Sequence, residues 1–170
     1  MKILAISGSA SKTSSNTLFL DTIKEHFSND YKIEVYNNLR NLPLFRPEDL
    51  DAEIPLSISE IKSKVKEADA IIISTPEYTH NIPAVLKNAI EWMTASGEFE
   101  NKKVLSITFT PNEPRGEHAM QSLLFSLKTM NARVVLQLPL YKTQVDIVEN
   151  KMTLGEELLF MISEGLKRLV

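Results

Sequence analysis

The sequence predicts an α/β fold in which a parallel sheet of five strands is covered by helices on both faces. Short apolar runs alternate along the chain with longer stretches whose apolar residues recur at helical spacing. This alternation favours a parallel sheet with right-handed crossovers. No linker, internal repeat or low-complexity tract divides the 170 residues, a length typical of one domain. We therefore expect a single domain over residues 1–170.

Five apolar runs have the length of strands, and several contain no polar residue, as is typical of parallel strands covered on both faces. The predicted strands are residues 3–6, 33–36, 70–73, 104–107 and 134–136. Two further segments do not fit the alternation, and we expect long loops there: residues 38–56, which contain three prolines, and residues 137–150.

Five amphipathic stretches are predicted to be helices because their apolar residues share one face. They are residues 16–28, 57–67, 82–95, 117–130 and a C-terminal helix whose apolar face runs from Leu154 to Leu169. Ser57 to Glu60 has the form of a capping box for the second helix. Asn81 is a candidate cap for the third helix, and Pro83 suits its first turn.

Composition excludes several kinds of site. The chain has no cysteine, which rules out disulfides, thiolate metal sites and cysteine nucleophiles. Its three histidines are not at metal-ligand spacing, so we expect no metal. The net charge of -3 gives no signal for nucleic acid, and no apolar run approaches the roughly 20 residues of a membrane span. The apolar start meets Gly8 too soon for a signal peptide, so we expect a cytoplasmic protein.

Ligands of open parallel sheets bind beyond the carboxyl ends of the strands, where three loops of this chain are expected to meet. The first loop, Ser7 to Asn16, combines a glycine with many hydroxyls ahead of a helix N-terminus, which suits a phosphate group. Such loops also cap helices without any ligand. The glycine motifs of P-loop nucleotidases and of dinucleotide-binding domains are both absent.

The second loop begins at Thr75 and leads into the helix that carries Trp92. Tyr78 is either a plain loop aromatic or a ligand contact, and Trp92 serves packing or a subunit interface. The third loop, Thr110 to His118, places Arg115 at a helix start, where it could bind an anion or be solvated.

These loops resemble those of the NADPH-dependent FMN reductase family, which includes azoreductases, quinone reductases and chromate reductases. One shared motif is Gly8-Ser9 followed by Ser14-Ser15-Asn16. The other is Pro76-Glu77-Tyr78 followed by Pro83 through Trp92. The resemblance covers essentially the whole chain. It implies a flavodoxin-like three-layer sandwich with strand order 2-1-3-4-5.

The resemblance also implies a function. FMN would be the cofactor, NADPH or NADH the co-substrate, and hydride would pass through the flavin to a small acceptor by a ping-pong mechanism. No catalytic side chain is implied, since the chemistry belongs to the flavin. The implied FMN contacts are Ser9, Ser11, Lys12, Ser14, Ser15, Asn16, Pro76, Glu77, Tyr78, Thr79, His80, Asn81, Thr110, Arg115 and Gly116.

The chain departs from the family pattern in three places. Where an arginine is usual, two residues after Ser9, it has Ser11, so neutralisation of the phosphate is expected from Lys12, hydroxyls and the helix end. The third loop contains two prolines in place of a glycine-rich stretch. Residues 79–81 replace a more usual Asn-x-Ser, which leaves His80 either at the acceptor pocket or in solvent.

Rival functions stay open at this point. An electron-carrier flavodoxin would bind FMN without reacting with NAD(P)H, and an assembly subunit would bind no flavin. A low-molecular-weight phosphatase needs a cysteine and is excluded. The resemblance further implies a homodimer or homotetramer, for which residues 43–55 and the helix that carries Trp92 are the interface candidates. The acceptor is open among flavins, quinones, azo compounds and metal oxyanions.

Overall fold

The computed structural model describes residues 1–50 and 53–170, and its centre is a five-stranded parallel sheet. The strands are β1 (Lys2–Ser7), β2 (Lys32–Tyr36), β3 (Ala70–Thr75), β4 (Lys103–Thr110) and β5 (Arg133–Tyr141). Their order is β2-β1-β3-β4-β5. The predicted α/β class, the five parallel strands and the 2-1-3-4-5 order are thus confirmed.

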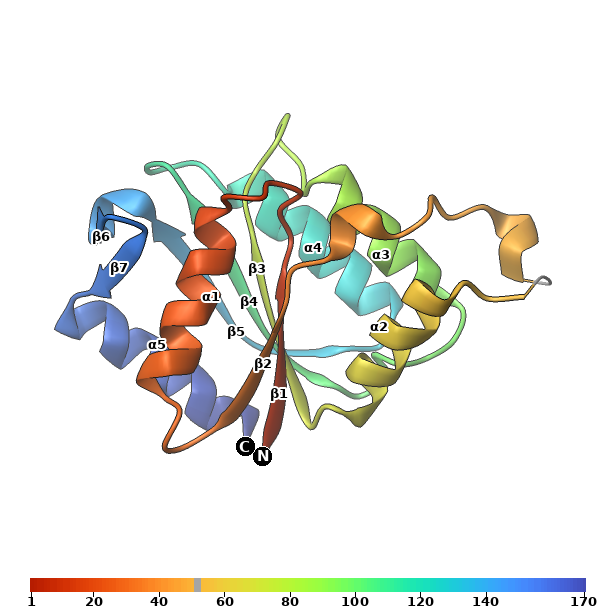
Figure 1. Ribbon diagram of the computed structural model, residues 1–170, viewed down its shortest axis with the longest axis horizontal. Helices are drawn as coiled ribbons and strands as arrows, with labels where there is room; N and C mark the ends of the chain where they lie inside the picture. The colour runs from red at the N-terminus through yellow and green to blue at the C-terminus, as the bar shows by residue number, and fades with distance from the viewer. Residues whose placement is uncertain (51–52) are drawn as a thin grey trace.

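Helices cover both faces of the sheet, as Figure 1 shows. They are α1 (Ser15–His26), α2 (Leu56–Glu67), α3 (Ala84–Thr94), α4 (Glu117–Thr129) and α5 (Glu156–Leu169). One apolar core joins the sheet to α1 and α5, and the other joins it to α2, α3 and α4. Alternate residues of β1 and β3 enter opposite cores, as the pleat of a strand requires. In β1, Ile3 faces α1 whereas Leu4 faces the other layer.

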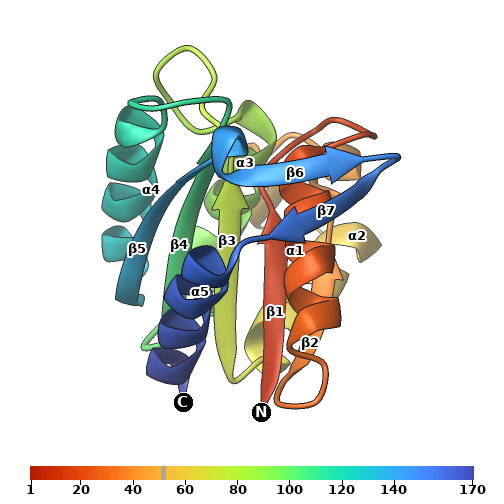
Figure 2. The ribbon, with the colours of Figure 1, turned by 90° about the vertical axis from the view of Figure 1, so that its left-hand side faces the viewer.

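The prediction of a loop at residues 137–150 is wrong. β5 continues to Tyr141 and pairs with the end of β4. The prediction missed this part because the edge strand alternates exposed and buried residues instead of forming one apolar run. A 3₁₀ turn, η3 (Lys142–Gln144), and an antiparallel hairpin of β6 (Val145–Val148) and β7 (Lys151–Leu154) follow it. The hairpin lies beside α1 (Figure 2). Leu154 therefore belongs to β7 and not to the C-terminal helix.

Two predicted helix starts also differ from the structure. Helix α2 begins at Leu56 after Pro55, which takes an extended conformation and leaves Ser57 inside the first turn, so no capping box forms. Helix α3 begins at Ala84, with Pro83 in the capping position. The Asn81 side chain instead accepts a hydrogen bond from the N–H of Ile82. In both cases the proline fixes the backbone just before the helix.

The expected loop at residues 38–56 contains two 3₁₀ turns, η1 (Leu39–Asn41) and η2 (Pro47–Leu50), while positions 51 and 52 lie outside the described residues. Trp92 is buried, and its indole N–H donates to the Pro43 carbonyl at 2.8 Å. Phe45 packs edge-on against it, so Trp92 serves packing within the chain. Within residues 1–50 and 53–170, no helix has the length and apolarity that crossing a membrane requires.

Candidate functional site

A hollow of about 260 Å³ lies at the carboxyl ends of β1, β3, β4 and β5. Its position is the one at which open parallel sheets bind ligands. All three loops singled out in the sequence contribute to it, together with the turn that follows β5. The lining residues are Ser9, Ser11, Thr13, Ser14, Ser15, Asn16, Pro76, Glu77, Tyr78, Phe109, Pro111, Arg115 and Lys142.

The first loop is held against β3 by its glycine. The N–H of Gly8 donates to the Ser74 carbonyl at 2.8 Å. A Cβ at this position would lie 2.9 Å from both Thr75 Oγ1 and Leu86 Cδ2. Only a residue without a side chain lets the loop cross so close to the strand end. The glycine thereby fixes the path of the loop from β1 to α1.

Hydroxyl groups organise the rest of this loop. Ser9 Oγ accepts from the Ser11 N–H at 3.2 Å, and Ser11 Oγ accepts from the Thr13 N–H at 3.3 Å. Ser14 caps α1 by accepting from the Thr17 N–H. In each of these bonds the hydroxyl oxygen is the acceptor, so its proton stays available to a ligand. The first turn of α1 adds N–H groups without intrahelical partners and the positive end of the helix dipole.

Asn16 lines the hollow and also has partners inside the protein. Its side chain is buried, its Nδ2 donates to the Phe109 carbonyl at 3.1 Å, and its Oδ1 accepts from Ser74 Oγ at 2.8 Å. The amide thus ties the start of α1 to the ends of β3 and β4. Asn16 can still offer a ligand its backbone N–H in the first turn of the helix.

Glu77 also works within the protein. Its Oε2 accepts from the Ala119 N–H at 3.0 Å, which places a carboxylate at the N-terminus of α4, where negative charge is favourable. Its Oε1 lies 3.7 Å from His80 Nδ1. The carboxylate is only 8% exposed, whereas the His80 side chain is 79% exposed. Glu77 therefore joins the second loop to α4.

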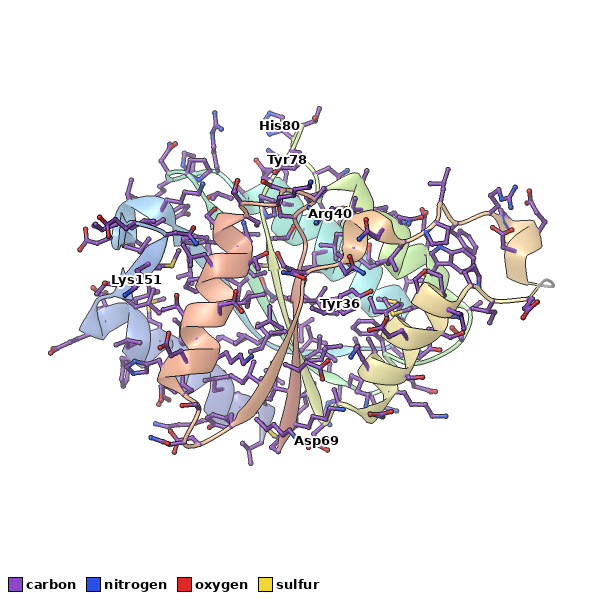
Figure 3. All side chains as sticks on the ribbon, in the orientation of Figure 1. Tyr36, Arg40, Asp69, Tyr78, His80 and Lys151 are labelled. Carbon is purple, nitrogen blue, oxygen red and sulfur yellow. The ribbon has the colours of Figure 1, made fainter. Side chains whose placement is uncertain are left out.

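The tip of the second loop turns back on itself. Tyr78 and Asn81 exchange two backbone hydrogen bonds, and Thr79 and His80 between them have positive φ angles of 52° and 55°. Figure 3 shows Tyr78 and His80 at the end of the molecule beyond β3, opposite Asp69. Tyr78 lines the hollow, whereas Thr79, His80 and Asn81 do not.

The third loop depends on Gly116, which precedes α4 with a φ of 108°. A Cβ there would lie 2.8 Å from Thr108 Oγ1. Thr110 Oγ1 donates to the Arg115 carbonyl at 2.9 Å, which closes the loop. Thr110 and Gly116 therefore shape the loop without lining the hollow, and Arg115 lines it.

The structure thus brings nine of the fifteen predicted residues together around the hollow. Lys12, Thr79, His80, Asn81, Thr110 and Gly116 lie outside its lining. Four lining residues were not predicted: Thr13, Phe109, Pro111 and Lys142. Thr13 shares the hydroxyl pattern of the first loop and was visible in the sequence. Lys142 had no local signal, because its segment was expected to be irregular.

The hollow combines cations with an apolar wall. Arg115 and Lys142 line it, and within the described part of the chain neither makes an ion pair. Glu77 is the one acid among the described lining residues, and its carboxylate caps α4. Tyr78 and Pro111 supply exposed apolar surface, whereas the Phe109 side chain is buried against Phe19 in the core. The set suits a ligand with an anionic end and a flat apolar end.

Comparison with known proteins agrees with this description. Residues 1–144 match the model of a family described as NADPH-dependent FMN reductase. The chain is 36% identical over 124 residues to the NADH:(hydroxy)cinnamate reductase subunit CrdA of Vibrio ruber, covering 73% of this chain and 60% of that one. It is 39% identical over 92 residues to the NADH-dependent flavin reductase subunit 2 of Lactobacillus johnsonii, covering 54% and 48%. The matched part of the chain thus spans about half to three fifths of the length of these relatives.

Among solved structures, the flavoenzyme NAD(P)H:(acceptor) oxidoreductase FerB of Paracoccus denitrificans superposes with a TM-score of 0.79 at 20% identity. This superposition covers 99% of this chain and 94% of FerB, and at such identity it shows the fold. The family model, in contrast, matches most of the sequence, including all three loops around the hollow. The chain therefore belongs to the NADPH-dependent FMN reductase family.

Proposed function

We propose that this protein binds FMN in the hollow and uses it to pass electrons from NAD(P)H to a small acceptor. The observation that supports this most strongly is the composition of the lining, which combines hydroxyls and a helix N-terminus with the exposed side chains of Tyr78 and Pro111. A phosphomonoester at the first and a flat ring at the second is the arrangement that FMN requires. Family membership supports the same cofactor.

The residues present fit the phosphate of FMN. Ser9, Ser11 and Ser14 keep hydroxyl protons to donate, and the first turn of α1 adds the N–H groups of Ser15 and Asn16. Hydrogen bonds from such donors to an ionised phosphate are short and strong. Gly8 keeps this cradle against β3, where a Cβ would collide with Thr75. Tyr78 and Pro111, the exposed apolar side chains of the lining, are placed to contact the ring system.

The protein itself would bind, orient and shield the reactants. Bound FMN would supply the redox chemistry, by taking hydride from NAD(P)H and giving it up to the acceptor. No side chain in the hollow is needed as a nucleophile. Glu77 is committed to the N-terminus of α4, so we assign it a positioning role and no proton transfer.

The finer features of this function are expectations that follow from the family. We propose a ping-pong order in which NAD(P)⁺ leaves before the acceptor binds. Flavins, quinones and azo compounds are the acceptor classes that the names of relatives support. Metal oxyanions stay an expectation from the family resemblance alone. We expect a homodimer or homotetramer, and native mass spectrometry tests this assembly. A cytoplasmic location is a separate expectation.

Two measurements on the purified protein test the proposal. We expect a flavin absorption spectrum, either as purified or after addition of FMN. Rapid anaerobic mixing with NADPH or NADH should bleach this spectrum. A spectrum that NAD(P)H leaves unchanged would indicate an electron carrier. A protein that stays colourless with micromolar FMN would contradict flavin binding and leave an assembly role.

A further inference from the structure

We propose that Lys142, and not Lys12, is the cationic side chain that neutralises the phosphate of bound FMN. This inference rests on the proposed function and adds a binding residue to it. Lys142 lies far from the phosphate loop in sequence, whereas Lys12 lies within that loop. In the structure, however, Lys142 lines the hollow and Lys12 does not.

The sheet brings Lys142 to the hollow. β5 pairs with β4 in a register that sets Tyr141 beside Thr110, the last residue of β4. Lys142 follows directly, so it begins at the carboxyl edge where the ligand loops gather. A tight turn holds it there, because the Tyr141 N–H donates to Gln144 Oε1 at 2.8 Å. The position of Lys142 is therefore set by backbone pairing.

The hairpin that follows fixes the side of the hollow on which Lys142 lies. β7 packs against α1, and Met152 and Leu154 are buried in the same core as Phe19 of that helix. Figure 2 shows the hairpin running beside the upper part of α1. Lys142 thus begins the segment that leads into the layer containing α1, whose N-terminus carries the phosphate loop. Arg115 instead directly precedes α4, in the other layer.

The charges around Lys142 favour a phosphate partner. Within the described residues its ammonium makes no ion pair, although it shares a small hollow with Arg115 and the positive end of α1. Burial raises the pKa of the neighbouring Tyr141, and the carboxylates of Glu113 and Glu117 raise it further. Neither of these acids lines the hollow. Like charges so grouped repel one another, and a phosphomonoester with about -1.5 to -2 charges relieves that repulsion.

The test compares FMN with riboflavin, which differ only in the phosphate. Binding of each flavin is measured by fluorescence quenching with the wild type, Lys142→Gln, Lys142→Arg and the matched control Lys12→Gln. We expect Lys142→Gln to weaken FMN binding about 10- to 100-fold, as loss of a charge-assisted hydrogen bond would, and to leave riboflavin binding within about twofold. Lys142→Arg should keep most of the FMN affinity, and Lys12→Gln should leave both flavins within about twofold.

Three results would overturn the inference. Unchanged FMN binding by Lys142→Gln would remove Lys142 from the phosphate site. Equal weakening of FMN and riboflavin would place Lys142 at the ribityl chain or the ring. A loss of FMN binding in Lys12→Gln alone would return the role to the phosphate loop. If the wild type itself binds FMN no more tightly than riboflavin, the proposed function fails together with the inference. If the wild type prefers FMN but Lys142→Gln binds FMN unchanged, only the inference fails.

Discussion

Replacement of Asn16 by alanine should destabilise the protein even when no ligand is bound. The change removes the bond from Nδ2 to the Phe109 carbonyl at 3.1 Å and the bond from Ser74 Oγ to Oδ1 at 2.8 Å. Each bond contributes about 1 kcal/mol net, and a buried group left unpaired costs about 1–3 kcal/mol. Asn16, Ser74 and Phe109 are all buried, so water does not replace the lost partner. We expect the free energy of unfolding to fall by about 2–4 kcal/mol.

Urea unfolding of the flavin-free protein measures this loss, and Asn112→Ala is the matched control. The Asn112 side chain is exposed and bonds only to the carbonyl of its neighbour Glu113, so its removal should change stability by less than about 0.5 kcal/mol. A double-mutant cycle with Ser74→Ala should return a coupling energy of about 0.5–1.5 kcal/mol between Asn16 and Ser74. If Asn16→Ala unfolds at the urea concentration of the wild type, the buried bridge between α1, β3 and β4 does not exist as described.

Three further outcomes follow from particular contacts. Glu77→Ala should lower the free energy of unfolding by about 1.5–3 kcal/mol because α4 loses its carboxylate cap, whereas Glu77→Gln should retain most of it; equal losses in urea unfolding would contradict the capping role. Gly116→Ala should cost more stability than Gly97→Ala: both glycines have positive φ, which strains alanine by about 1–3 kcal/mol, but only Gly116 would also force a Cβ against Thr108. Burial raises the pKa of Tyr36 above its value of 10.0 in the unfolded chain, so the folded protein holds this proton more tightly. Its contribution to stability is present below pH 10 and lost as the pH rises above it, and Tyr36→Phe should flatten that loss in unfolding curves taken between pH 9 and 11.

The fold was predictable wherever the apolar pattern was strong. β1 and β3 are buried on both faces, and each contains an apolar run without a polar residue, at residues 3–6 and 70–73, as is typical of a central parallel strand. β5 is an edge strand, and its second half alternates exposed and buried residues around Pro139. The continuous apolar run ends at residue 136, so the apolar pattern predicts only the first part of this strand. The hairpin after it has short strands whose packing against α1 depends on tertiary contacts.

The site was predictable as a set of loops but not as a set of side-chain roles. Motif spacing placed Ser9, Ser14 and Tyr78 at one edge of the sheet, where the structure has them. It did not reveal that Asn16 and Glu77 have partners inside the protein, because those partners are distant in sequence. Lys142 joins the hollow only through the pairing of β5 with β4.

The proposed function depends on recognition of the FMN phosphate by the loop between β1 and α1, and one calorimetric comparison tests this recognition directly. Wild-type protein is titrated with FMN and then, in a separate experiment, with riboflavin at the same ionic strength. Hydroxyls, helix N–H groups and cations directed at one phosphate should make FMN bind at least about 100-fold more tightly than riboflavin. Equal affinity for the two flavins would show that nothing in the loop between β1 and α1 recognises a phosphate.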